Sequence, residues 1–146
     1  MGVVAQGRPE NLAKHADLVL RATVAGSTPP PRGLYSNVKG TGGIDLVVDA
    51  VLSNRTDIQL SPADTVFAMY PETAQAPEAA VGQTVTVFCS RDGEGWQFAN
   101  TIFSLRRMED GNAVSSPNAR GCAEDWDVVI PISVFMEALS DARTDR

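Results

Sequence analysis

The alternation of hydrophobic and polar positions predicts a β-hairpin in the second half of the chain. Along Thr84–Ser90, Val85, Val87 and Cys89 occupy one face, which is the period of a half-buried strand. The following segment, Arg91–Gly95, contains an Asp-Gly pair, which is typical of tight hairpin turns because glycine adopts positive φ without a steric penalty. The segment therefore predicts a strand, a turn and a returning strand.

The returning strand changes phase along its length. Trp96 and Phe98 share one face, whereas Phe103 and Leu105 have the opposite parity. We therefore expect a bulge or sharp bend within residues 100–102. Because bulges curve a sheet, this change of phase favours a barrel over a flat sheet.

The rest of the chain alternates between apolar strand-like segments, loop-like segments and two helical segments. Further strands are predicted over Leu18–Val24, Ile44–Leu52, Thr65–Tyr70 and Trp126–Ile132. Stretches rich in Pro, Gly or polar residues predict loops over Gly26–Gly43, Pro71–Val81 and Glu109–Glu124. A short helix is predicted over Pro9–Ala16, and a longer one begins near Ser133, with Phe135 and Leu139 on the side expected to pack against the sheet.

Together these elements predict one mainly β domain over residues 1–146. Five short strands within residues 16–108 favour an antiparallel Greek-key barrel of the oligonucleotide/oligosaccharide-binding (OB) type, with a β-sandwich as the alternative. A further strand and the C-terminal helix, over residues 126–143, are expected to follow the barrel.

Four stretches also resemble a known family, the netrin-like barrel shared with tissue inhibitors of metalloproteinases. They are ADLVLRATV at Ala16–Val24, IDLVVDAVL at Ile44–Leu52, DTVFAMY at Asp64–Tyr70 and VGQTVTVFCSRDGEGW at Val81–Trp96. The resemblance covers residues 16–108, rests on apolar spacing and implies an OB-like barrel. The strand and helix after it are similar to those of bacterial members, whose function is generally unknown.

One property of the animal members is not expected here. Those proteins have a cysteine-rich framework, and the inhibitors reach the zinc of their target enzyme with an N-terminal cysteine. This chain has Met1 at that position and two cysteines in all. Inhibition by that route is therefore not implied by the resemblance.

Composition narrows the range of partners. No stretch approaches the roughly 18 apolar residues that a membrane-spanning helix needs. The net charge of −6 repels phosphate backbones and anionic lipid surfaces. We therefore expect a protein or small-molecule ligand, and neither nucleic-acid binding nor membrane insertion.

The two cysteines bear on the cellular location. In an exported protein Cys89 and Cys122 would form a disulfide, whereas in the cytoplasm they would be buried thiols. We predict the disulfide and, with it, a periplasmic or extracellular protein, and the cytoplasm remains the alternative.

No sequence motif points to catalysis, a metal or a cofactor. His15 is the single histidine, and as a helix-end residue it is more typical of a surface side chain than of a ligand or base. Lys39–Gly43 resembles a phosphate-binding loop, but a strand rather than a helix follows it. Asp45 and Asp49 share a strand face, as solvated carboxylates commonly do. We expect no metal and no cofactor.

Two classes of function remain. The first is a non-catalytic binding or protein-interaction module; the second is a small enzyme or protease inhibitor whose site is built from loops. In OB-like barrels, ligands lie across the second and third strands, between the loop that joins strands one and two and the loop that joins strands four and five. Here these loops are Gly26–Gly43 and Arg91–Gly95. The predicted binding residues lie in them or directly after them: Leu34, Tyr35, Arg91, Asp92 and Trp96. In the alternative interpretation, Tyr35 and Trp96 cover the open end of the barrel.

Overall fold

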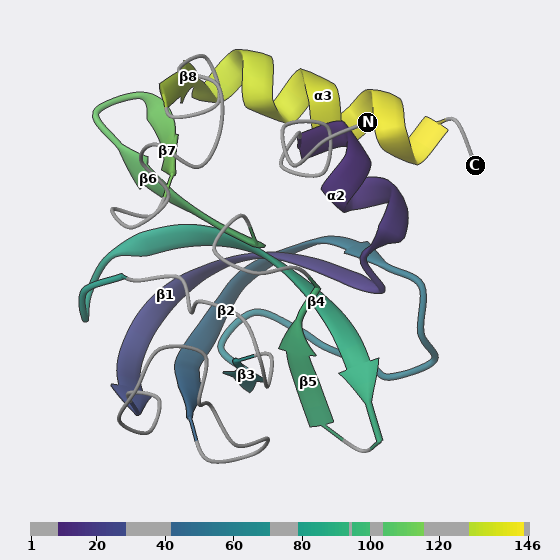
Figure 1. The fold of residues 1–146 in the computed structure, drawn as a ribbon, viewed down its shortest axis with the longest axis vertical. Coiled ribbons are helices and arrows are strands. Elements are labelled where there is room, and N and C mark those ends of the chain that lie inside the picture. The colour runs from purple at the N-terminus through teal and green to yellow at the C-terminus, as the bar shows by residue number, and fades with distance from the viewer. Residues whose placement is uncertain are drawn as a thin grey trace.

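A computed structural model describes residues 9–28, 42–70, 79–93, 95–99, 104–115 and 129–144. The described chain is mainly β, with a barrel on one side and two helices on the other (Figure 1). The predicted fold class is therefore confirmed.

Five strands close the barrel. They are β1 (Leu18–Thr28), β2 (Gly43–Asn54), β3 (Thr65–Met69), β4 (Thr84–Asp92) and β5 (Gly95–Phe98). Their order is β1-β2-β3-β5-β4, and β4 pairs again with β1. The β3–β5 pairing is parallel and the other four are antiparallel, which is the arrangement of an OB-like barrel.

The predicted hairpin forms, and its returning arm consists of two separate strands. β5 pairs with the Cys89–Asp92 half of β4. β6 (Leu105–Glu109) pairs with the Val85–Val87 half. Two strands that lie along different halves of one neighbour need not share a phase, and this explains the change of parity between Phe98 and Leu105. Residues 100–102, where the bend was expected, lie outside the described residues.

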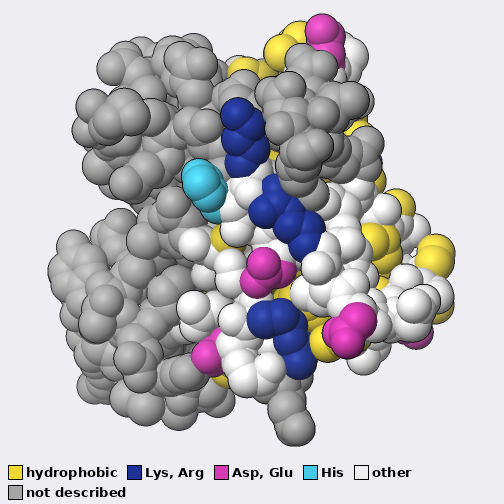
Figure 2. Space-filling view, turned by 90° about the vertical axis from the view of Figure 1, so that its right-hand side faces the viewer, with side chains coloured by type: hydrophobic (Ala, Val, Ile, Leu, Met, Phe, Trp, Pro, Cys, Tyr) yellow, Lys and Arg dark blue, Asp and Glu magenta, His cyan; other side chains and the backbone are white. Residues whose placement is uncertain are grey.

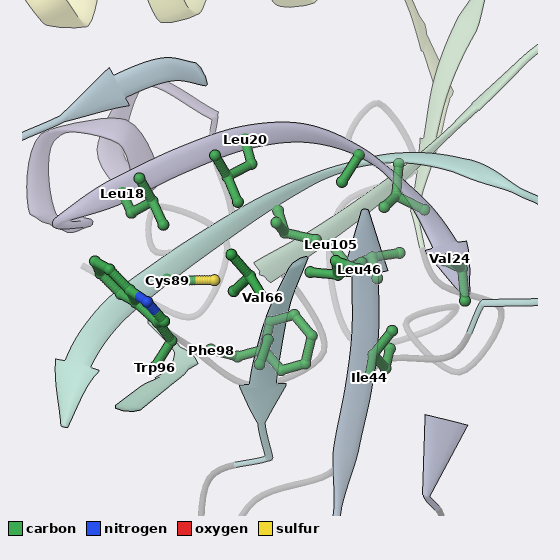
Figure 3. Close-up of a cluster of buried hydrophobic side chains, with 14 of the residues drawn as sticks. Leu18, Leu20, Val24, Ile44, Leu46, Val66, Cys89, Trp96, Phe98 and Leu105 are labelled. Atoms are coloured by element: carbon green, nitrogen blue, oxygen red, sulfur yellow. The ribbon is translucent and has the colours of Figure 1, made fainter. Parts of the chain in front are cut away.

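The barrel interior is filled by the alternating apolar residues. Even-numbered positions of β1 from Leu18 to Val24 and of β2 from Ile44 to Val48 point inward and meet the odd-numbered residues of β4 (Figure 3). Beyond Val48 the predicted phase of β2 is wrong: Val51 packs against the interior cluster and Leu52 against an outer one, where the β1–β2 register shifts. The buried members of the interior cluster are Leu18, Leu20, Ala22, Val24, Ile44, Leu46, Val48, Val66, Ala68, Tyr70, Val85, Val87, Cys89, Trp96, Phe98 and Leu105. Each large apolar side chain removed from water contributes about 1.5–3 kcal/mol, so this cluster is the main source of the barrel's stability.

One predicted loop is partly wrong. Within Glu109–Glu124, residues Asn112–Ser115 form strand β7, which pairs with β6. The two strands are joined by a tight turn in which Asp110 has φ 51° and Gly111 has φ 81°. Such turns favour an Asp-Gly pair, so a hairpin forms here although the segment is polar. A short strand, β8 (Val129–Pro131), then pairs with β7 within the predicted Trp126–Ile132 strand.

The two helices, α2 (Pro9–His15) and α3 (Ile132–Thr144), lie together on the outer surface of the barrel (Figure 1). A second apolar cluster holds them there, made of Leu12, Ala13, Ala16, Val19, Phe88, Ala113, Phe135 and Leu139. Phe135 meets Phe88 edge to face, with ring centroids 6.4 Å apart. The predicted packing of the C-terminal helix through Phe135 and Leu139 is confirmed.

Candidate binding surface

The structure brings two of the predicted binding residues into direct contact. Arg91 and Trp96 are opposite each other in the β4–β5 pair, and the guanidinium carbon of Arg91 lies 4.7 Å from the centroid of the Trp96 ring. The backbone N–H of Arg91 donates a hydrogen bond of 2.9 Å to the carboxylate of Asp17, which follows α2. Arg91 is therefore held in a cation–π contact at the end of the barrel.

Trp96 is a core residue rather than an exposed anchor. Its side chain is 7% exposed and packs in the same cluster as Phe98 (Figure 3). This burial favours the interpretation in which Trp96 covers the end of the barrel.

The other predicted binding residues are less informative. Asp92 is half-buried and pairs with Gly95 at the β4–β5 turn. Leu34 and Tyr35 lie outside the described residues, as does most of the loop between β1 and β2. Their predicted roles therefore stay predictions.

The predicted Cys89–Cys122 disulfide is not supported. Cys89 carries a free thiol and is fully buried, with its sulfur inside the barrel (Figure 3). Burial raises the pKa of this thiol to about 12, so it stays protonated and unreactive at neutral pH. Alternation along β4 places Cys89 in the apolar core, away from the strand's outer face. Cys122 lies outside the described residues.

The outer surface of β2 and β3 presents a partly exposed aromatic ring beside a carboxylate. Asp45 of β2 is opposite Phe67 of β3, and both point away from the core. Phe67 is 36% exposed, which is unusual for so large an apolar side chain in this molecule. Met69, two residues further along β3, is half-buried on the same side. We call the surface formed by Asp45, Phe67 and Met69 the β2–β3 face.

Each side chain of this face lies next to a glycine of a neighbouring strand. A Cβ on Gly43 would come within 2.8 Å of Phe67 Cζ, and one on Gly95 within 3.2 Å of Met69 Cε. A Cβ on Gly26 would be 3.3 Å from Asp45 Oδ2. The three side chains of the face therefore extend over neighbouring backbone that carries no side chain of its own.

Two carboxylates on β2 differ in their surroundings. Asp49 accepts a 2.9 Å hydrogen bond from the Thr23 hydroxyl, and its charge favours the protonated form of nearby Arg21. Burial acts more strongly in the opposite direction, so the net effect on the Arg21 pKa is a decrease. The side chain of Asp45 is exposed, and no described residue donates a hydrogen bond to it or forms an ion pair with it. Asp45 is therefore the carboxylate of this face that can receive an external cation.

Elsewhere the surface charges are mixed. On the side of the molecule shown in Figure 2, Lys and Arg side chains lie in a row, with Asp or Glu side chains between them. Arg55 belongs to the segment after β2, and its guanidinium donates to the carbonyl of Ala13 near the end of α2. His15, at the end of α2, is exposed. This alternation of sign does not form a single-sign patch among the described side chains.

Among the described residues, no group of three or more His, Cys, Asp or Glu side chains is placed to hold a metal ion. In the same part of the chain, no helix has the length and hydrophobicity needed to cross a bilayer.

Sequence reasoning missed Phe67 as a candidate binding residue. The signal was present, because Phe67 lies between Val66 and Ala68, which both point inward, and alternation therefore places the ring outside. An aromatic residue at an outward position of a strand is the pattern that would have identified it.

Comparison with known proteins adds no relative. No protein-family model matches this chain, and no curated protein matches its sequence.

Proposed function

We propose that this protein is a non-catalytic binding or protein-interaction module whose ligand lies on the β2–β3 face. The observation that carries the proposal is the exposed side chain of Phe67 at the position paired with Asp45, whose exposed carboxylate has no hydrogen-bond or ion-pair partner among the described residues. Exposed apolar groups next to polar ones are typical of interaction sites.

The architecture supports this position. In OB-like barrels, the ligand lies across the second and third strands, and the connection between the fourth and fifth strands borders it. Here the corresponding strands are β2 and β3, and the corresponding connection is the Asp92–Gly95 turn. Met69 lies next to this turn, since a Cβ on Gly95 would be 3.2 Å from Met69 Cε.

Two related expectations remain proposals. A netrin-like relationship is supported by the OB-like strand order, which that family shares. Export is a separate proposal and draws no support from Cys89, whose thiol is free. No specific observation on the described residues favours the alternative of a small enzyme or inhibitor.

Site-specific photo-crosslinking tests the binding proposal. The photoreactive residue p-benzoylphenylalanine replaces Gln97, which is opposite Met69 on the neighbouring strand β5. In the control protein it replaces Val134, which is 52% exposed on α3. In extracts of the producing cells, a discrete crosslinked product from position 97 and none from position 134 is expected. Products from position 134 alone would move the binding surface to α3, and none from either position would contradict the proposal.

A further inference from the structure

The β2–β3 face offers two complementary groups for one cationic side chain. The Asp45 carboxylate and the Phe67 ring are at paired positions of adjacent antiparallel strands, where side chains on the same face are direct neighbours. A carboxylate accepts hydrogen bonds from a cation, and the face of an aromatic ring attracts the same positive charge. One ligand group could therefore contact both residues.

Among biological cations, the guanidinium group fits this pair best. It is planar, stacks on aromatic rings and presents several N–H donors that match a carboxylate. The ammonium group of lysine is compact and strongly hydrated, so it gains less from a flat aromatic surface. The protein already contains such a contact in Arg91, whose guanidinium lies 4.7 Å from the centroid of the Trp96 ring.

Charge also favours a protein partner. The net charge of −6 attracts cationic surfaces and repels polyanions such as nucleic acids.

We propose that the β2–β3 face binds an arginine side chain of a partner protein, with the guanidinium stacked on Phe67 and hydrogen-bonded to Asp45. This inference rests on the proposed binding function and specifies the chemistry of the partner. Among the described residues, Arg21 donates to the Thr86 hydroxyl and the Met136 sulfur, and Asp49 accepts from the Thr23 hydroxyl, so neither is bonded to Asp45.

Affinity chromatography on immobilised arginine tests this assignment. Retention of the full chain is compared on arginine–agarose and lysine–agarose at the same ionic strength. Asp45→Asn is expected to weaken binding to arginine roughly two- to fivefold. Phe67→Leu, which keeps an apolar side chain but removes the ring, is expected to weaken it by a similar factor. Circular dichroism verifies that both variants are folded.

A matched control separates local binding from ion exchange. Asp57→Asn removes the same charge from another exposed aspartate and should leave retention nearly unchanged. Three results would each contradict the proposal. The first is an equal loss of retention for Asp45→Asn and Asp57→Asn, and the second is equal retention of the protein on lysine–agarose and arginine–agarose. The third is displacement of the bound protein by a neutral oligosaccharide but not by free arginine. If the arginine assignment fails while crosslinks form at position 97, the binding function stands with a different partner. If neither the arginine-specific retention nor the crosslink at position 97 is observed, both proposals are overturned.

Discussion

Replacement of Trp96 by alanine tests whether this ring is part of the core or available to a ligand. The side chain is 7% exposed, contacts the barrel interior and is covered by the Arg91 guanidinium. Truncation of so large a buried aromatic leaves a cavity and costs about 3–5 kcal/mol. For a chain of 146 residues this corresponds to a decrease in melting temperature of roughly 8–15 °C.

The control is Arg91→Ala, which removes the cation but keeps the ring. It should lower the free energy of unfolding by about 1 kcal/mol, because a cation–π contact at a partly exposed site contributes little. Urea denaturation followed by far-ultraviolet circular dichroism measures both variants without relying on the fluorescence of the residue that is changed. A loss below about 1 kcal/mol for Trp96→Ala would refute the assignment of this ring to the core.

Three other predictions follow from the structure. Phe135→Ala should lower the free energy of unfolding in urea by about 3–5 kcal/mol because the ring is fully buried against Phe88. Val134→Ala, on the exposed side of α3, should change it by less than about 0.5 kcal/mol, and similar losses for the two variants would contradict the packing of α3. Gly43→Ala should destabilise the protein by about 1–3 kcal/mol, since the new Cβ would lie 2.4 Å from the carbonyl oxygen of Ala68, and a neutral result would mean that β2 and β3 are further apart than described. Cys89 should react with Ellman's reagent at pH 8 only after unfolding. Because its folded pKa of about 12 exceeds the unfolded value near 8.5, the free energy of unfolding should fall as pH rises from about 9 towards 12. Cys89→Ala should lack this part of the pH dependence when the stability of both proteins is measured across that range.

Alternation identified most of the barrel because one face of each strand points into the barrel interior. The interior residues of β1 and β2 from Leu18 to Val24 and from Ile44 to Val48 are the even-numbered ones that the sequence pattern selected. Odd-numbered Val19 is also buried, in the second cluster with the helices, and Leu52 packs against that cluster. Pairing was harder to predict, since the parallel contact between β3 and β5 joins segments whose relation no local pattern records. Strand β7 was not predicted because the polar composition of its segment is typical of a loop, although Asp110-Gly111 is the same turn dipeptide that identified the β4–β5 turn.

The candidate site was only partly predictable for a related reason. Trp96 was predicted as a binding residue or as a cover for the barrel end, and its burial in the core cluster depends on neighbours from several strands that a sequence does not reveal. Phe67 and Asp45 become significant only when β2 and β3 are in register, because this pairing puts the two residues at opposite positions of neighbouring strands. Gly26, Gly43 and Gly95 are far apart in sequence, so their common role appears only in three dimensions.

The central claim, that the β2–β3 face is the binding surface, is tested most directly by amide NMR of the isotope-labelled protein during titration with arginine methyl ester. Saturable shifts at Asp45, Phe67 and Met69 are predicted, with little change along α3, and these shifts should disappear in Asp45→Asn. Shifts confined to α3 or to the Lys14 and Arg55 region, or shifts that persist unchanged in Asp45→Asn, would contradict the claim.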